Sequence, residues 1–82
     1  MNKKETYYRL LDEKHYNTIV KVDSVTRYKY VPVKGWVESA LFWYYLDDSS
    51  DLYEKYEEIT ADEAIAKYGV KPEHIMKVLQ YE

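Results

Sequence analysis

The sequence predicts a single α+β domain, in which a three-stranded antiparallel β-meander is followed by a short aromatic helix and a C-terminal helical hairpin. The 82 residues leave room for one domain only, so residues 1–82 are taken as one unit. In the first part of the chain, β-branched and aromatic residues alternate with polar ones, as is typical of strands. In the last part, capping residues and a glycine mark the ends of two helices.

Three short segments predict the strands of the meander. They are ETYYRLLD (5–12), TIVKV (18–22) and RYKYVPV (27–33). Alternation along the third segment places Tyr28 and Tyr30 on one face and Arg27 and Lys29 on the other. We therefore expect the two tyrosines in the core and the two cations in solvent. Pro32 cannot donate a ladder hydrogen bond, so the strand ends there or lies at an edge.

The segment WVESALFWYYL (36–46) predicts a short aromatic helix. Helical spacing would place Ala40, Trp43 and Tyr44 on one face. Because aromatic residues also favour strands, a strand over the same residues stays open as an alternative.

The C-terminal segment contains the clearest local signals. Thr60 and Glu63 have the spacing of a capping box, which predicts the start of a helix. Gly69 follows the helical run where a left-handed residue commonly ends a helix. Pro72 suits the first turn of a second helix, whose packing residues would include Ile75. Together these residues predict the helical hairpin.

Composition argues against several classes of protein. Cysteine is absent, which removes disulfides, thiolate metal sites and cysteine nucleophiles. No apolar run approaches the roughly 20 residues that cross a bilayer, and the basic start lacks the apolar segment of a signal peptide. We therefore expect a cytoplasmic protein without a membrane partner.

Catalysis and cofactor binding find little support in the sequence. No serine or cysteine motif accompanies His15 or His74. Gly35 and Gly69 are isolated, so they cannot form a phosphate-binding loop. A calcium-loop-like spacing of acids is present, but Leu52 stands where that loop needs glycine. We expect no enzyme activity, no cofactor and no metal.

An acidic segment with interspersed tyrosines is the best candidate for a binding surface. Residues 1–35 have a net charge of +4 and residues 36–82 of −7, and residues 47–63 contain eight acids and one lysine. Aromatic residues are enriched in protein interfaces, and complementary charge steers association. These features predict a non-enzymatic protein–protein interaction module that docks on a basic partner surface, and an inhibitor is one concrete form of it. The predicted contact residues are Trp43, Tyr44, Asp47, Asp48, Asp51, Tyr53, Glu54, Tyr56, Glu57 and Glu58.

Residues 59–79 resemble a helix-turn-helix, because Gly69 separates two predicted helices. The resemblance implies a DNA-binding regulator as the alternative function. The residues that would then face DNA are Lys71, His74 and Lys77. The segment departs from the motif at Ile65, where a small residue is usual. Residues 59–82 also have a net charge of −1, which does not favour binding to phosphates. A structural helical hairpin packed on the sheet is therefore the simpler interpretation.

The string YEEITADEA (56–64) also resembles small uncharacterised proteins of Gram-positive bacteria and their phages. In those proteins, a tyrosine-rich sheet and a tryptophan segment precede such a string. The resemblance implies an accessory protein of a phage or mobile element, and it brings no activity with it. A homodimer also stays open, since the predicted strands would leave an unprotected edge and exposed aromatic residues.

Overall fold

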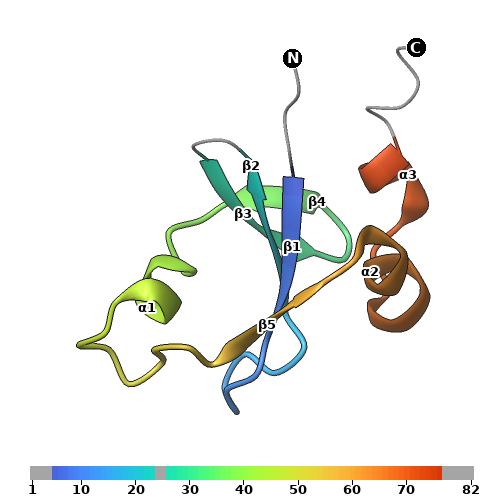
Figure 1. Ribbon diagram of the computed structural model, residues 1–82. Helices are drawn as coiled ribbons and strands as arrows, with labels where there is room; N and C mark the ends of the chain where they lie inside the picture. Colours follow the sequence, from blue (N-terminus) through green and yellow to red (C-terminus); the bar gives the residue numbers. More distant parts are fainter. Residues whose placement is uncertain (1–4, 24–25, 77–82) are drawn as a thin grey trace.

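The protein is described by a computed structural model, in which residues 5–23 and 26–76 are placed. These residues form one antiparallel sheet of five strands, in the order β4-β3-β2-β1-β5, and three short helices (Figure 1). The predicted α+β class is thereby confirmed. The elements are β1 (Glu5–Leu10), β2 (Ile19–Asp23), β3 (Thr26–Val31), β4 (Gly35–Glu38), α1 (Trp43–Leu46), β5 (Tyr56–Ile59), α2 (Ala61–Tyr68) and α3 (Pro72–Met76).

The sheet has five strands where three were predicted. Its first four strands are neighbours in chain order, whereas β5 returns to pair with β1, so that Tyr7 lies opposite Ile59. Strand β5 has only four residues and two of them are glutamates. Its place in the sheet comes from a pairing distant in sequence, which a local pattern does not contain.

The second correction concerns residues 36–46, for which a helix was predicted and a strand was left open as the alternative; the structure contains both. The chain turns after Val31 and re-enters the sheet at Gly35, whose φ of 93° lies in the left-handed region that favours glycine. Trp36 then pairs with Tyr30, and their rings pack edge to face at 5.0 Å. Only the last four residues of the segment, Trp43–Leu46, are helical. The aromatic segment therefore contributes Trp36 to strand β4 and Trp43–Leu46 to helix α1.

One face of the sheet, which we call the α2 face, is covered by α2 and α3 (Figure 1). Tyr30 is buried here and Tyr28 lies on the same face, as the alternation predicted. The buried side chains of this core are Tyr7, Ile19, Tyr30, Ile59, Ala64 and Val70, and Trp36, Ala61, Tyr68 and Ile75 pack against them.

Helix α2 begins and ends where the sequence predicted. Thr60 accepts a hydrogen bond from the Glu63 backbone N–H, and the Glu63 carboxylate accepts one from the Thr60 backbone N–H, each at 3.0 Å. Gly69 ends the helix with φ 80°, and Pro72 starts α3. The predicted continuation of α3 beyond Met76 lies outside the described residues. Among those residues no helix is both long and apolar enough to cross a membrane.

The opposite face, which we call the α1 face, has a second core. Leu10 and Val20 contribute from the sheet, and Phe42 and Tyr45 cover them from the α1 segment. Tyr8 and Phe42 stack at 4.9 Å within it. The sheet therefore separates two cores, with α1 on one side and the α2–α3 segment on the other (Figure 1).

Candidate functional site

Helix α1 has one buried side and one exposed side, although it contains only four residues. Tyr45 is completely buried, and Phe42 just before the helix is 3% exposed. Trp43 and Tyr44, between them in sequence, are 54% and 57% exposed, and Leu46 is 39% exposed. The two inward rings fix the helix on the sheet, and so the outward side chains are presented from an anchored element.

A buried polar cluster adds to this anchoring. The Tyr45 hydroxyl donates to Asp12 Oδ1 at 2.5 Å, and His15 Nδ1 lies 3.0 Å from Asp12 Oδ2. The backbone N–H of His15 also donates to Oδ2. Burial acts to raise the pKa of Asp12, but the hydrogen bonds from Tyr45 and His15 outweigh it and hold that pKa below its ordinary value. An ionised carboxylate thus joins α1 to the loop between β1 and β2.

The exposed ring of Trp43 is itself held in place by Arg27. The guanidinium carbon of Arg27 lies 4.1 Å from the centroid of the Trp43 ring, a distance at which cation–π attraction is worth about 0.5–2 kcal/mol. Arg27 had been expected in solvent, but it is only partly exposed, because the tryptophan covers it. Its Nε is buried without a hydrogen-bond partner in the part of the chain that the structure describes.

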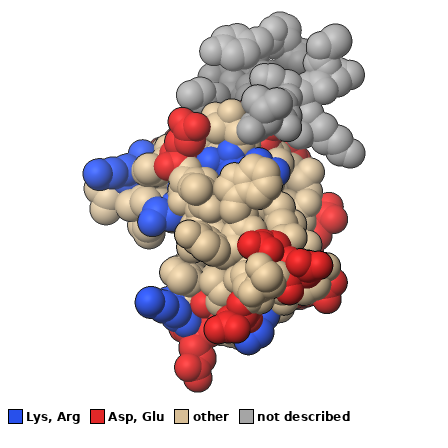
Figure 2. Space-filling model, turned by 90° about the vertical axis from the view of Figure 1, so that its left-hand side faces the viewer, with Lys and Arg blue, Asp and Glu red and all other residues tan. Residues whose placement is uncertain are grey.

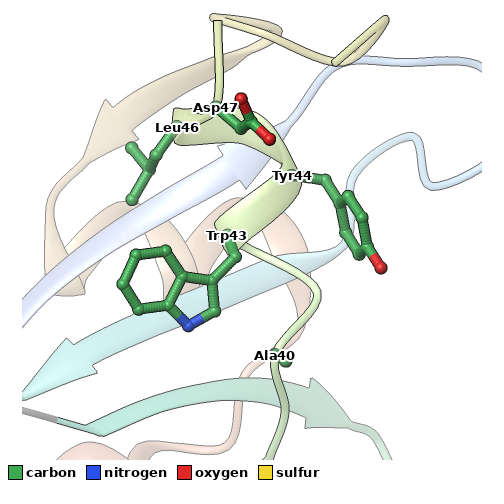
Figure 3. Close-up of a pocket in the computed structure, with 5 residues that line it drawn as sticks. All are labelled: Ala40, Trp43, Tyr44, Leu46 and Asp47. Atoms are coloured by element: carbon green, nitrogen blue, oxygen red, sulfur yellow. The ribbon is translucent and has the colours of Figure 1, made fainter. Parts of the chain in front are cut away.

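A pocket of about 520 Å³ lies over α1, lined by Ala40, Trp43, Tyr44, Leu46 and Asp47. We call these five residues the α1 surface. Figure 3 shows Trp43 and Leu46 extending from one side of the helix, Tyr44 from the other, and Asp47 at the C-terminal end. A smaller pocket of about 280 Å³, which includes Arg27 and Glu38, also borders Trp43. The indole therefore contributes to two neighbouring depressions.

The loop after α1, residues 47–55, is folded on itself by hydrogen bonds. Asp47 Oδ1 accepts from the backbone N–H of Ser49 at 3.0 Å and from its hydroxyl at 2.8 Å. These bonds hold the pKa of Asp47 below its ordinary value. The Glu54 backbone N–H donates to Tyr45 O and closes the loop onto the helix. The acidic residues of the loop are therefore displayed on an ordered turn.

Negative charge gathers around this loop. Asp47, Asp48, Asp51 and Glu54 are all exposed. The carboxylate of Glu54 raises the pKa of Tyr53, and burial and Asp48 add to that effect. Figure 2 shows the side of the molecule that α1 covers, where a cluster of acidic side chains is separated from most basic ones by uncharged surface. The α1 surface thus has an acidic border.

The structure brings some of the predicted contact residues together and separates others. Trp43, Tyr44 and Asp47 share the pocket. The exposed loop residues Asp48, Asp51, Tyr53 and Glu54 follow directly in sequence.

Three other predicted residues lie on strand β5, outside the helix and its loop. The Tyr56 ring is partly buried and packs against the core, 5.0 Å from Phe42. Glu57 belongs to the α2 face, because it bonds Arg9 at 2.8 Å and Arg9 stacks on Tyr68 of α2. Glu58 is exposed on β5 opposite Tyr8, and so it lies on the α1 face although it does not line the pocket.

The residues of the alternative, DNA-binding interpretation do not form one exposed group. The His74 ring faces inward, with Nδ1 3.0 Å from the Tyr30 hydroxyl. The Trp36 indole N–H donates to the His74 carbonyl, which ties α3 to β4. Lys71 is exposed, and Lys77 lies outside the described residues. His74 is therefore a packing residue of the α2 face.

Sequence reasoning did not assign Arg27, Leu46 or the Asp12 cluster to the site. Arg27 and Trp43 are 16 positions apart, and the segment between them forms β4, which had been predicted as helix. Asp12 follows an apolar run and resembles an ordinary turn residue. Leu46 lies at the end of the predicted aromatic helix, and its place beside the predicted contact residues was the available signal. No sequence pattern marks the other two.

Comparison of the chain with protein families, with curated proteins and with solved structures finds no match in any of the three. Residues 5–23 and 26–76 contain no group of three or more His, Cys, Asp or Glu side chains that could hold a metal ion.

Proposed function

We propose that the protein is a non-enzymatic protein-binding module and that a partner protein docks on the α1 surface and its acidic loop. The observation that carries this proposal is the exposure of Trp43 and Tyr44, each more than half exposed, on a helix whose other side is buried. Aromatic residues are enriched in protein interfaces, and tryptophan and tyrosine are frequent hot spots. Because their helix is anchored, little ordering is required on binding.

The charge around this surface favours a basic partner. The acidic loop residues would attract positive charge and repel negative charge, which accelerates encounter and selects partners. Such a partner surface would be suited to nucleic acid as well. One concrete form of the proposal is therefore an inhibitor, encoded by a phage or mobile element as an accessory protein. It would occupy the basic surface of a factor that the host encodes.

Capture of a partner by surface variants tests the proposal. The tagged protein and its Trp43→Ala variant are used side by side with bacterial lysate, and any captured protein is purified for affinity measurement. Tyr16→Ala is the matched control, since Tyr16 is 60% exposed but lies outside the α1 surface. We expect Trp43→Ala to lower the affinity for the purified partner at least about 30-fold, which is the size of a hot-spot loss. Tyr16→Ala should change that affinity little. Equal binding by all three proteins, or recovery of DNA that persists in Trp43→Ala, would contradict the proposal.

A further inference from the structure

The pocket on the α1 surface combines an apolar wall with one carboxylate. Trp43, Leu46 and Ala40 provide apolar surface, and Asp47 is the charged one among the described residues that line it. One face of the Trp43 ring is already occupied by Arg27. The orientation of the ring is thereby set before any ligand arrives, and the remaining indole surface contributes to the pocket (Figure 3).

Asp47 has an oxygen available for a ligand. Both hydrogen bonds that it accepts, from the N–H and the hydroxyl of Ser49, reach Oδ1. In the part of the chain that the structure describes, no hydrogen bond reaches Oδ2. The Ser49 bonds orient the carboxylate and favour its charged form. An oriented, ionised oxygen at the border of an apolar pocket is suited to a cationic donor.

We infer that the pocket receives a lysine or arginine side chain of a partner protein, whose aliphatic stem lies against Trp43 and Leu46 and whose charged head bonds Asp47 Oδ2. This inference rests on the proposed function and specifies its ligand. A long basic side chain matches both halves of the pocket, because its stem is apolar and only its end is charged. A purely apolar side chain would cover the Asp47 carboxylate without a partner, and an acidic one would be repelled by it.

The loop residues extend the same preference beyond the pocket. Asp48 and Asp51 follow Asp47 closely in the sequence, and both are exposed and carry the same charge as Asp47. A partner segment with further basic residues beside the inserted one would therefore be favoured over an isolated lysine.

The two tryptophans allow a direct test by NMR. The ¹⁵N-labelled protein is titrated with the peptide Ac-Gly-Lys-Gly-NH₂ and with matched peptides that contain norleucine or glutamate in place of lysine. The indole N–H signal of Trp43 should move with the lysine peptide. The Trp36 signal is the internal control, because that indole donates to His74 O on the other face of the sheet. The norleucine peptide, which keeps the stem and loses the charge, should bind at least about tenfold more weakly.

Two variants with the same change of charge complete the test. Asp47→Asn keeps an oxygen for the Ser49 turn and should lose about tenfold in affinity for the lysine peptide. Asp51→Asn should lose less than about threefold, since an exposed charge outside the pocket contributes weakly. Equal binding of the lysine and norleucine peptides, or equal losses in the two variants, would overturn the inference. A preference for the glutamate peptide would also overturn it and would identify an acidic ligand. Shifts of the Trp43 signal when the protein alone is concentrated would overturn it as well and would identify a second copy as the occupant.

Failure of the inference is distinguishable from failure of the proposed function. If the lysine peptide does not bind but partner affinity still depends on Trp43, the docking surface is right and its ligand chemistry is wrong. If the lysine peptide binds at Trp43 but partner affinity does not depend on that residue, the pocket chemistry is right and the proposed docking surface is wrong.

Discussion

Substitution of Tyr45 by phenylalanine should lower the stability of the protein by about 2 kcal/mol at neutral pH. The ring keeps its place in the core, where Tyr45 is completely buried, so the change removes only the hydroxyl. That hydroxyl donates to Asp12 Oδ1 at 2.5 Å, and Asp12 is 8% exposed. Hydrogen bonds to charged groups contribute about 1.5–3 kcal/mol. His15 still satisfies the other carboxylate oxygen, which places the expected loss inside this range.

The loss should depend on pH in a defined direction. The pKa of Asp12 is lower in the folded protein than its ordinary value of 3.8, so its stabilising effect is complete above that value. The effect disappears as pH falls through the lower, folded-state pKa and Asp12 is protonated. Without the Tyr45 hydroxyl, the pKa of Asp12 rises. The difference in stability between the two proteins should therefore be largest near neutral pH and shrink in acid.

The assay is urea unfolding followed by tryptophan fluorescence, at about pH 7 and at a series of decreasing pH values in the acid range. A loss of about 2 kcal/mol corresponds to a decrease in Tm of roughly 10 °C for a domain of this size. Tyr44→Phe is the matched control, because Tyr44 is exposed in the same helix, and it should change stability by less than about 0.5 kcal/mol. A Tyr45→Phe loss below about 0.5 kcal/mol at neutral pH, or a loss that grows as the pH falls, would contradict a hydrogen bond from Tyr45 to an ionised Asp12.

Three further substitutions test the local structure, each measured by chemical unfolding. Thr60→Ala removes the hydroxyl that accepts the Glu63 N–H and should cost about 1 kcal/mol. Gly69→Ala should also cost about 1 kcal/mol, because its φ of 80° is unfavourable for alanine. The added methyl group would meet nothing within 4 Å, so no steric clash adds to this loss. Gly35→Ala should cost more than Gly69→Ala, because it adds a contact of 3.3 Å with the His74 ring to a φ of 93°. A larger loss at Gly69 than at Gly35, or no loss at Thr60, would contradict these expectations.

The features that were predictable from the sequence are those in which a few neighbouring residues determine the backbone. The capping box of Thr60 and Glu63 joins residues three apart, and Gly69 acts through its own φ. Alternation along β3 separated Tyr28 and Tyr30 from Arg27 and Lys29 for the same local reason. In each case the information lies within one short segment.

The features that were missed depend on contacts between distant segments. Strand β5 pairs with the first strand of the chain, and β4 is defined by its pairing with β3. Asp12 meets Tyr45 from 33 positions away. The exposed aromatic residues of the site were recognised by type, but Tyr56 was assigned to the same surface although it packs against Phe42. Which tyrosines face a partner and which fill a core is decided by packing, and residue type is the same for both.

The most direct test of the proposed function is site-specific photocrosslinking from the α1 surface. p-Benzoylphenylalanine replaces Tyr44 in one protein and Tyr16 in another; the two positions are similarly exposed, but Tyr16 lies beside Arg9, whose side chain is on the α2 face. Each protein is irradiated with the purified partner, and the joined peptides are identified by mass spectrometry. We predict a strong adduct from position 44, on a partner segment that contains lysine or arginine, and little from position 16. A strong adduct from position 16 and none from position 44 would show that the partner docks elsewhere, and it would contradict the account.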